Sequence, residues 1–234
     1  MPVESPAISR NQQRIIVLDT ETTGFQPYDK IVTLAAMCIE NDRVLTRSLY
    51  LVFDPRKDSH PDAIRVHGWD NWTTRFQDLF ADHAAALHDW LGWADTLVMH
   101  NAEFDMHYLQ REFRKAEHPL LKHRTDCTLQ RARGRWPGQK CGLDECAERI
   151  GIAPRQGHHC ALEDVFLTTA LYLHGRGVTF SVPAPPRWPD PTNFHPPEPR
   201  PPGPLPRRSP KHRSLEAFSA HQLAIDTNNV TYGM

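Results

Sequence analysis

Prolines are concentrated near the end of this chain, and their position limits where a folded core can form. Residues 183–210 hold 13 of the 21 prolines in the 234-residue sequence. Proline fixes the backbone angle φ and has no N–H to donate, so such a stretch cannot enter a helix interior or a central strand. We therefore expect residues 179–213 to form an extended, disordered linker, and residues 13–178 to supply the packed domain.

Charge and cysteine content exclude several other classes of protein. The 27 basic residues nearly balance the 28 acidic ones, so a large basic surface for gripping long duplex DNA is not expected. Five cysteines without a paired spacing indicate reduced thiols in a cytoplasmic protein. Residues 1–12 are polar and contain two prolines, which predicts a flexible N-terminus and no signal peptide. No apolar run approaches the ~20 residues that cross a bilayer.

Hydrophobic patterning before the prolines predicts a mixed α/β domain. Apolar and β-branched runs predict three early strands, followed by helices and one more strand. The expected strands are residues 14–20, 30–40, 43–53 and 96–100, and the expected helices are residues 74–93, 102–116, 126–134, 142–150 and 160–175. This order favours one mixed sheet with helices packed against it.

The end of the first strand carries the strongest chemical signal. The segment Asp19-Thr20-Glu21-Thr22-Thr23-Gly24 directly follows the apolar run Ile15-Ile16-Val17-Leu18. Residues two apart on a strand point to the same face, so Asp19 and Glu21 present two carboxylates side by side. Crowded carboxylates repel each other, and a divalent cation removes that repulsion. This segment therefore predicts a metal-dependent site that acts on a phosphate group.

Two later segments carry partners for this pair. His100-Asn101-Ala102-Glu103-Phe104-Asp105 follows a second buried strand, and His159-Cys160-Ala161-Leu162-Glu163-Asp164 opens an apolar helical stretch. The order Asp-x-Glu, then Asp, then His-x4-Asp resembles the DnaQ-like (DEDDh) 3′–5′ exonucleases, a family that includes the proofreading subunits of bacterial replicative DNA polymerases. The resemblance covers roughly residues 13–177 and implies an RNase-H-like mixed sheet flanked by helices.

The resemblance implies a metal centre built from four carboxylates. Asp19 would bridge two Mg²⁺ or Mn²⁺ ions, Glu21 and Asp164 would complete the ion that holds the attacking water, and Asp105 would help to hold the other ion. Oxygen ligands suit such hard cations, and two ions about 3.5–4 Å apart can stabilise the entering and leaving oxygens of a phosphodiester cleavage. The alternative is a zinc site, but its spacing is loose and it would occupy the catalytic histidine; its ligands would come from Cys141, Cys146, His158, His159 and Cys160.

His159 is the expected general base, with Glu21 beside it. His159 lies five residues before Asp164, and on a regular helix the two side chains would point roughly 140° apart. Both can face one site only if His159 lies in a loop before the helix, which the nearby Gly157 favours. A histidine with a pKa near ~6.5 is a suitable base for water. The adjacent His158 is the alternative base.

The resemblance also implies a set of contacts with the terminal nucleotide. The residues concerned are Thr22, Thr23, Gly24, Phe25, His67 and Asn101. Phe25 would stack on a base without regard to sequence, or else pack in the core. His67 is alternatively a structural residue of the Val66-His67-Gly68 turn, and Asn101 is expected first of all to cap the helix at 102–116.

Together these features predict an exonuclease that releases nucleoside 5′-monophosphates from single-stranded or frayed DNA 3′ ends, in proofreading or end-trimming. Trimming of RNA 3′ ends is an alternative, because this active site does not itself choose the sugar. A catalytically silent scaffold that binds a polymerase or clamp is another.

The short tail at residues 214–234 is the expected partner-binding segment. Its Gln222-Leu223-Ala224-Ile225-Asp226 partly resembles the sliding-clamp-binding motif of bacterial replication proteins, although Asp226 replaces the terminal aromatic. The tail should bind a polymerase or a sliding clamp across the linker, or contact nucleic acid weakly through the basic cluster at 207–213.

Overall fold

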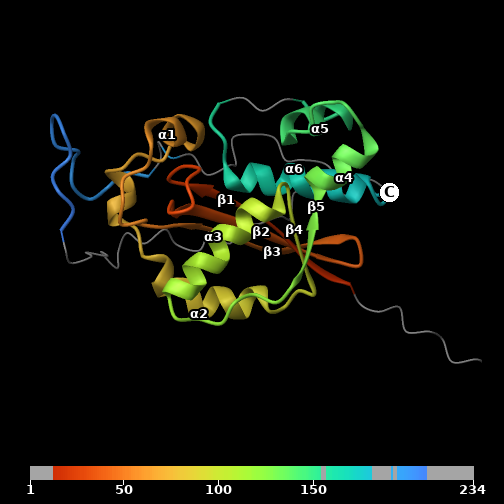
Figure 1. Ribbon diagram of the computed structural model, residues 1–234, viewed down its shortest axis with the longest axis horizontal. Helices are drawn as coiled ribbons and strands as arrows, with labels where there is room; N and C mark the ends of the chain where they lie inside the picture. The colour runs from red at the N-terminus through yellow and green to blue at the C-terminus, as the bar shows by residue number, and fades with distance from the viewer. Residues whose placement is uncertain (1–12, 154–156, 181–190, 192–193, 210–234) are drawn as a thin grey trace, which may run out of the picture.

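The computed structural model describes residues 13–153, 157–180, 191 and 194–209. It contains five strands, one 3₁₀ helix and six α-helices within these residues (Figure 1). In chain order they are β1 (Arg14–Thr22), β2 (Ile31–Glu40), β3 (Arg43–Val52), α1 (Pro61–His67), the 3₁₀ helix η1 (Thr73–Phe76), α2 (Phe80–Leu91), β4 (Thr96–Met99), α3 (Ala102–Lys115), β5 (Arg124–Cys127), α4 (Thr128–Arg135), α5 (Leu143–Arg149) and α6 (Ala161–His174). None of these helices is long and apolar enough to span a bilayer.

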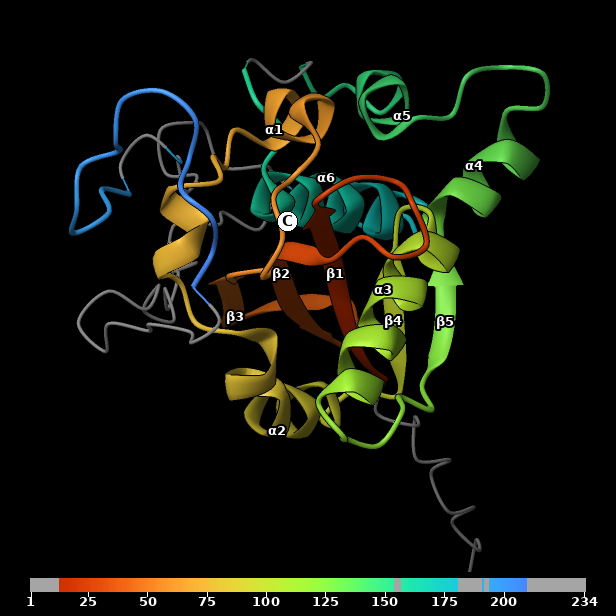
Figure 2. The ribbon, with the colours of Figure 1, turned by 60° about the vertical axis from the view of Figure 1, so that its left-hand side comes forward.

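The strands form one mixed sheet in the order β3-β2-β1-β4-β5. Strands β3, β2 and β1 are antiparallel neighbours, whereas β1, β4 and β5 run parallel. Helix α6 covers one face of the sheet, and α2 and α3 cover the other (Figures 1 and 2). This arrangement confirms the predicted α/β fold with helices on both sides of a mixed sheet.

The central strand β1 is buried on both faces, and its alternation decides where the later residues point. Ile15 and Val17 pack in the core beneath α6, whereas Ile16 and Leu18 pack in the core beneath α2 and α3. All four side chains are fully buried, which explains the continuous apolar run in the sequence. Continuing the alternation directs Asp19 and Glu21 toward α6 and Thr20 toward α3.

The structure differs from the predicted elements in three places. The expected helix at 74–93 is interrupted, because the backbone is extended at Gln77 and α2 begins only at Phe80. Asp82 marks this start by accepting a hydrogen bond from the Leu79 N–H at 2.8 Å. The other two differences are β5 and α1, neither of which was predicted: β5 is exposed or half-buried and carries no apolar run, and only two residues of α1, Ala63 and His67, are buried.

Part of the proline-rich stretch also differs from the expected extended, disordered linker. Phe180 packs on α6, with its ring 5.8 Å from that of Phe166. Residues 194–209 lie against the domain beside η1 (Figure 2). The flexible N-terminus predicted for 1–12 and the tail predicted for 214–234, with its clamp-like motif, fall outside the described residues.

Candidate active site

The acidic residues of the three motifs converge where β1 leaves the core. Asp19 and Glu21 end β1, Asp105 lies in the first turn of α3, and Asp164 lies in the first turn of α6. Helix α3 follows β4, which is parallel to β1, so its N-terminus begins at the same edge of the sheet. The first turns of both helices favour a negative charge because the helix dipole is positive there.

Three of the predicted side chains form a compact group. Glu21, His159 and Asp164 each offer a possible ligand atom, and these atoms all lie within 4.8 Å of one another. The Nδ1 atom of His159 is 4.0 Å from Oδ2 of Asp164. Two carboxylates and an imidazole at this separation are suited to hold a divalent cation and to handle a proton beside it.

His159 reaches this group because it precedes the helix. It lies in the segment before α6, as the five-residue spacing required, and its backbone N–H donates to the Val66 carbonyl at 2.7 Å. Its side chain remains 43 % exposed, so solvent and substrate can reach the ring. The neighbouring His158 instead places its Nδ1 3.0 Å from the Arg65 carbonyl, and it is not part of this group.

Asp105 approaches the site from the other face of the sheet. Its Oδ1 accepts hydrogen bonds from the Thr20 N–H at 3.1 Å and the Thr20 hydroxyl at 2.8 Å. Burial, with a smaller contribution from the nearby charge of Asp164, raises the pKa of the Asp105 carboxyl to about 7. Asp105 and Asp19 lie outside the 4.8 Å group, so the structure joins only three of the predicted side chains within that limit.

A pocket of about 310 Å³ opens beside the end of β1. We call it the terminal pocket, and its lining residues come from the loop after β1, the segment after β3 and the start of α1: Thr23, Gly24, Phe25, Gln26, Tyr28, Asp29, Lys57, Asp58, Ser59, His60, Asp62 and Ala63. Phe25 is 74 % exposed, which rules out core packing for its ring. The hydroxyls of Thr22 and Thr23 donate to the Gly24 carbonyl and the Asp29 carboxylate, so they shape this loop.

Comparison with known families decides what this arrangement represents. A family model described as Exonuclease matches residues 16–172, which include every carboxylate and histidine of the site. This chain belongs to the exonuclease family. The order of its motifs correctly predicted that it is a DnaQ-like 3′–5′ exonuclease, a phosphodiester hydrolase.

Curated relatives agree with this assignment. The exonuclease is 32 % identical over 185 residues to DNA polymerase III subunit epsilon of Pasteurella multocida, covering 74 % of this chain and 69 % of that one. It is 34 % identical over 176 residues to the subunit of the same name from Haemophilus influenzae, covering 70 % and 67 %.

Two solved structures share the fold. Exonuclease X in complex with 5′ overhanging duplex DNA superposes with a TM-score of 0.55 and 24 % identity, over 68 % of this chain and 89 % of that chain. E. coli Exonuclease I in complex with an oligonucleotide superposes with a TM-score of 0.63 and 19 % identity, over 71 % and 41 %.

Three residues predicted to bind substrate do not line the terminal pocket: Thr22, His67 and Asn101. His67 is 1 % exposed, and its Nδ1 accepts a hydrogen bond from the Trp69 N–H at 3.0 Å. Burial lowers the pKa of His67 to about 4, so the ring is neutral, as suits a structural residue. Asn101 occupies the predicted N-cap position of α3 with a φ of 83°, but its side chain makes no capping hydrogen bond.

Sequence reasoning missed one wall of the terminal pocket. Lys57 forms an ion pair with Asp29, and its Nζ lies 4.9 Å from the centre of the Tyr28 ring, which is 63 % exposed. Burial alone would raise the pKa of Asp29, but hydrogen bonds from Lys57, the Gln26 N–H and Thr23 hold it below its usual value. The two exposed aromatics, Phe25 and Tyr28, were the available signal, because they are only three residues apart.

Asp105 should make the metal-free exonuclease less stable as the pH rises. The pKa of Asp105 is about 7 in the folded chain and 3.8 as an ordinary carboxyl, so between these values only the folded chain keeps the proton. Unfolding then releases a proton, and raising the pH favours unfolding by at most about 1.4 kcal/mol per pH unit. Asp105→Asn keeps the acceptor oxygen for Thr20 and removes this titration.

Urea denaturation in EDTA at pH 5 and pH 7 measures the effect. The wild type should lose about 1–3 kcal/mol more of its free energy of unfolding between these values than Asp105→Asn does. Equal losses in the two proteins would show that Asp105 is ionised in the folded chain at pH 5.

Proposed function

We propose that this exonuclease removes nucleoside 5′-monophosphates, one at a time, from single-stranded or frayed DNA 3′ ends during proofreading. Two divalent cations, Mg²⁺ or Mn²⁺, assist the reaction, and Asp19, Glu21, Asp105 and Asp164 hold them. The compact group of Glu21, His159 and Asp164 at the end of β1 is the observation that carries the proposal.

The donor set fits such cations. Its ligands are mainly carboxylate oxygens, which hard divalent ions prefer over nitrogen or sulfur. Asp105 and Asp164 are both buried, and burial together with the charge of Asp164 raises the pKa of Asp105, an effect that a bound cation would offset. Bound there, the cations would supply positive charge to the developing charges on the phosphate oxygens.

The protein's own groups then have separate tasks. His159, exposed and beside Asp164, accepts a proton from the water that attacks the terminal phosphorus. Glu21 lies within the same group and orients the imidazole and the attacking water. The bond between phosphorus and the 3′ oxygen of the preceding nucleotide breaks, that oxygen takes up a proton from solvent to leave a 3′-hydroxyl end, and a nucleoside 5′-monophosphate leaves.

The terminal pocket supports attack at an end of the strand. It is about 310 Å³ in volume, which suits one nucleotide, and the exposed ring of Phe25 offers a stacking surface for any base. Thr23 and Gly24 bring the backbone close to this space. A pocket that accepts a single terminal nucleotide favours stepwise release over internal cleavage.

A 3′-labelled single strand tests direction and substrate together. With Mg²⁺ or Mn²⁺, the label should appear at once as a mononucleotide, and a 3′-phosphate should slow its release. Matched DNA and RNA strands in parallel decide the sugar, with DNA expected to be cleaved faster. Cleavage of a circular single-stranded DNA would contradict the proposal, and faster cleavage of RNA than of DNA would identify RNA as the substrate.

Curated relatives named DNA polymerase III subunit epsilon suggest the setting. We propose that this chain acts beside a replicative polymerase in the cytoplasm. The tail at 214–234 is the proposed contact with that polymerase or with a sliding clamp.

A further inference from the structure

Residues 194–209, which we call the C-terminal strap, contact the domain at several points along their length. The ring of Phe194 lies 4.8 Å from the ring of Trp69, a buried residue of the core beneath α6. Further along, the Trp72 indole N–H donates to the Glu198 carbonyl at 2.8 Å. Both tryptophans are less than 10 % exposed, so the strap begins on a packed aromatic surface.

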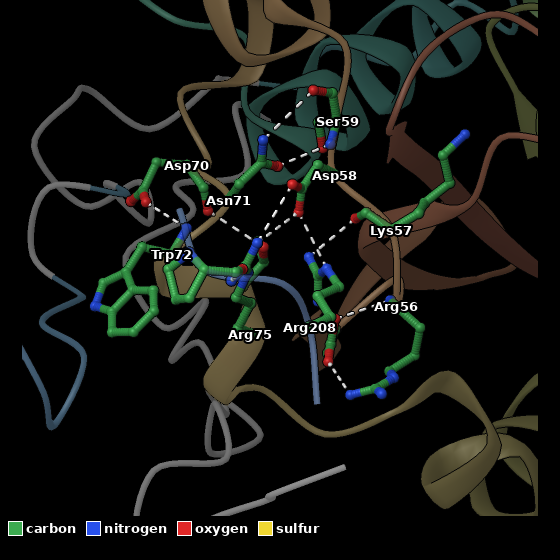
Figure 3. Close-up of polar contacts among 12 residues, drawn as sticks. Arg56, Lys57, Asp58, Ser59, Asp70, Asn71, Trp72, Arg75 and Arg208 are labelled. Atoms are coloured by element: carbon green, nitrogen blue, oxygen red, sulfur yellow. Dashed lines mark hydrogen bonds and ion pairs between the residues drawn. The ribbon is translucent and has the colours of Figure 1, made fainter. Parts of the chain in front are cut away.

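Arg208 joins the end of the strap to the segment after β3 (Figure 3). Its guanidinium forms an ion pair with Asp54, lies 3.0 Å from Oδ1 of Asp58 and donates to the Lys57 carbonyl at 3.0 Å. The Arg208 side chain is 14 % exposed and the Asp54 side chain is fully buried. A buried carboxylate needs charged or hydrogen-bonding partners, and the planar guanidinium supplies three donors in one plane.

Arg75 provides a second connection between the strap and the same segment. Its Nη1 donates to the Pro206 carbonyl at 2.7 Å, and its Nη2 lies 3.2 Å from Oδ1 of Asp58. Asp58 is therefore shared by Arg75 from η1 and Arg208 from the strap (Figure 3). Ion pairs with two guanidinium groups restrain the Asp58 side chain, and with it the backbone of this segment, more firmly than one ion pair would.

The segment held in this way is one wall of the terminal pocket. Lys57, Asp58 and Ser59 all line that pocket, and the next residue, His60, donates its N–H to the Thr23 carbonyl at 2.7 Å. The Ser59 N–H donates a hydrogen bond to Oδ1 of Asn71 at 2.8 Å. A shift of this segment would change the width of the pocket without touching the carboxylates at the end of β1.

We propose that Arg208 is a positioning residue, through which the C-terminal strap holds residues 57–59 in place for binding the terminal nucleotide. This inference rests on the proposed role of the terminal pocket. It predicts that removing the Arg208 side chain raises KM and leaves kcat nearly unchanged. A preorganised pocket wall favours substrate binding, whereas the reacting groups at the end of β1 stay in place.

Steady-state kinetics on a 3′-labelled single strand, with the full chain and saturating Mg²⁺, test the proposal. Arg208→Ala should raise KM about five- to tenfold and change kcat less than about twofold. Arg200→Ala, a strap residue that is 58 % exposed and lies 3.9 Å from Asp70, makes the same change of charge outside the basic cluster and should leave both constants unchanged. Arg208→Lys should lie between, because one ammonium cannot contact three acceptors at once. Unchanged KM in Arg208→Ala, or a fall in kcat with constant KM, would overturn the proposal.

Hydrogen exchange gives a readout that needs no catalysis. In Arg208→Ala the amides of 54–60 should exchange at least about tenfold faster, while those of β1 keep their protection. If Arg208→Ala folds poorly because the buried Asp54 keeps its ion pair with Arg56 but loses the one with Arg208, the double variant Asp54→Asn/Arg208→Ala removes the carboxylate charge and should show the same raised KM and exchange. Wild-type protection at 54–60 in these variants would refute the strap's role. If the wild-type chain released no nucleotides from the 3′ end, only the proposed function would be refuted, because hydrogen exchange tests the strap independently of catalysis.

Discussion

Asp164→Asn should lower kcat by about 10³-fold or more while leaving the folded protein intact. The amide would keep the size of the side chain but remove the negative charge that holds a cation. Such a cation stabilises the transition state by several kcal/mol, and each 1.4 kcal/mol changes the rate about tenfold. Asp164 is buried and raises the pKa of Asp105, so losing its charge also relieves repulsion. The melting temperature without metal should therefore stay the same or rise.

The matched control is Glu163→Gln, which makes the same change of charge in the same turn of α6. Glu163 lies outside the group formed by Glu21, His159 and Asp164, so this variant should keep wild-type turnover. EDTA should abolish activity in the wild type, and added Mg²⁺ or Mn²⁺ should restore it. Full turnover in excess chelator, or equal losses in the two variants, would argue against a metal site at Asp164.

His159→Ala should lower kcat by about 10²–10⁴-fold, the usual contribution of a general base. His159 lies before α6, with its ring half-exposed and 4.0 Å from the Asp164 carboxylate. The variant should bind Mn²⁺ nearly as well as the wild type, because the carboxylates remain. It should also lose the fall in rate at acidic pH that protonation of a histidine base produces.

His158→Ala is the control for this experiment, since the Nδ1 of His158 lies 3.0 Å from the Arg65 carbonyl and this histidine is not part of the group formed by Glu21, His159 and Asp164. Its turnover should stay within about threefold of wild type, far from the loss expected for a base. A larger loss in His158→Ala than in His159→Ala would reassign the base. Loss of Mn²⁺ binding in His159→Ala would show that the imidazole is a ligand and leave the base unassigned.

Local patterns in the sequence were enough to place β1 and its two carboxylates. A continuous apolar run predicts a strand buried on both faces, and the two-residue alternation of a strand puts Asp19 and Glu21 on one side. Helical geometry likewise placed His159 in a loop, because a spacing of five residues cannot join it to Asp164 on one helix. These features depend only on neighbours in the chain, so the sequence alone could determine them.

Contacts between distant segments were beyond such patterns. Asp105 is held by Thr20, which is 85 residues away and points to the opposite face of β1 from Asp19. Lys57 enters the terminal pocket through its pair with Asp29, 28 residues earlier. Neither contact has a local signature, because each depends on how the sheet and its loops stack in space.

The proline-rich stretch shows the same division most clearly. Its composition argued against helices and strands, and residues 194–209 form neither, but composition did not decide whether they pack against the domain. Carbonyls outside a helix or sheet have no ladder partner and need another donor, and here those of Glu198 and Pro206 accept hydrogen bonds from the side chains of Trp72 and Arg75. The sequence by itself determined that this segment has no regular secondary structure. Only the tertiary structure, by bringing Arg208 to a buried carboxylate 154 residues earlier, decided that it belongs to the folded domain.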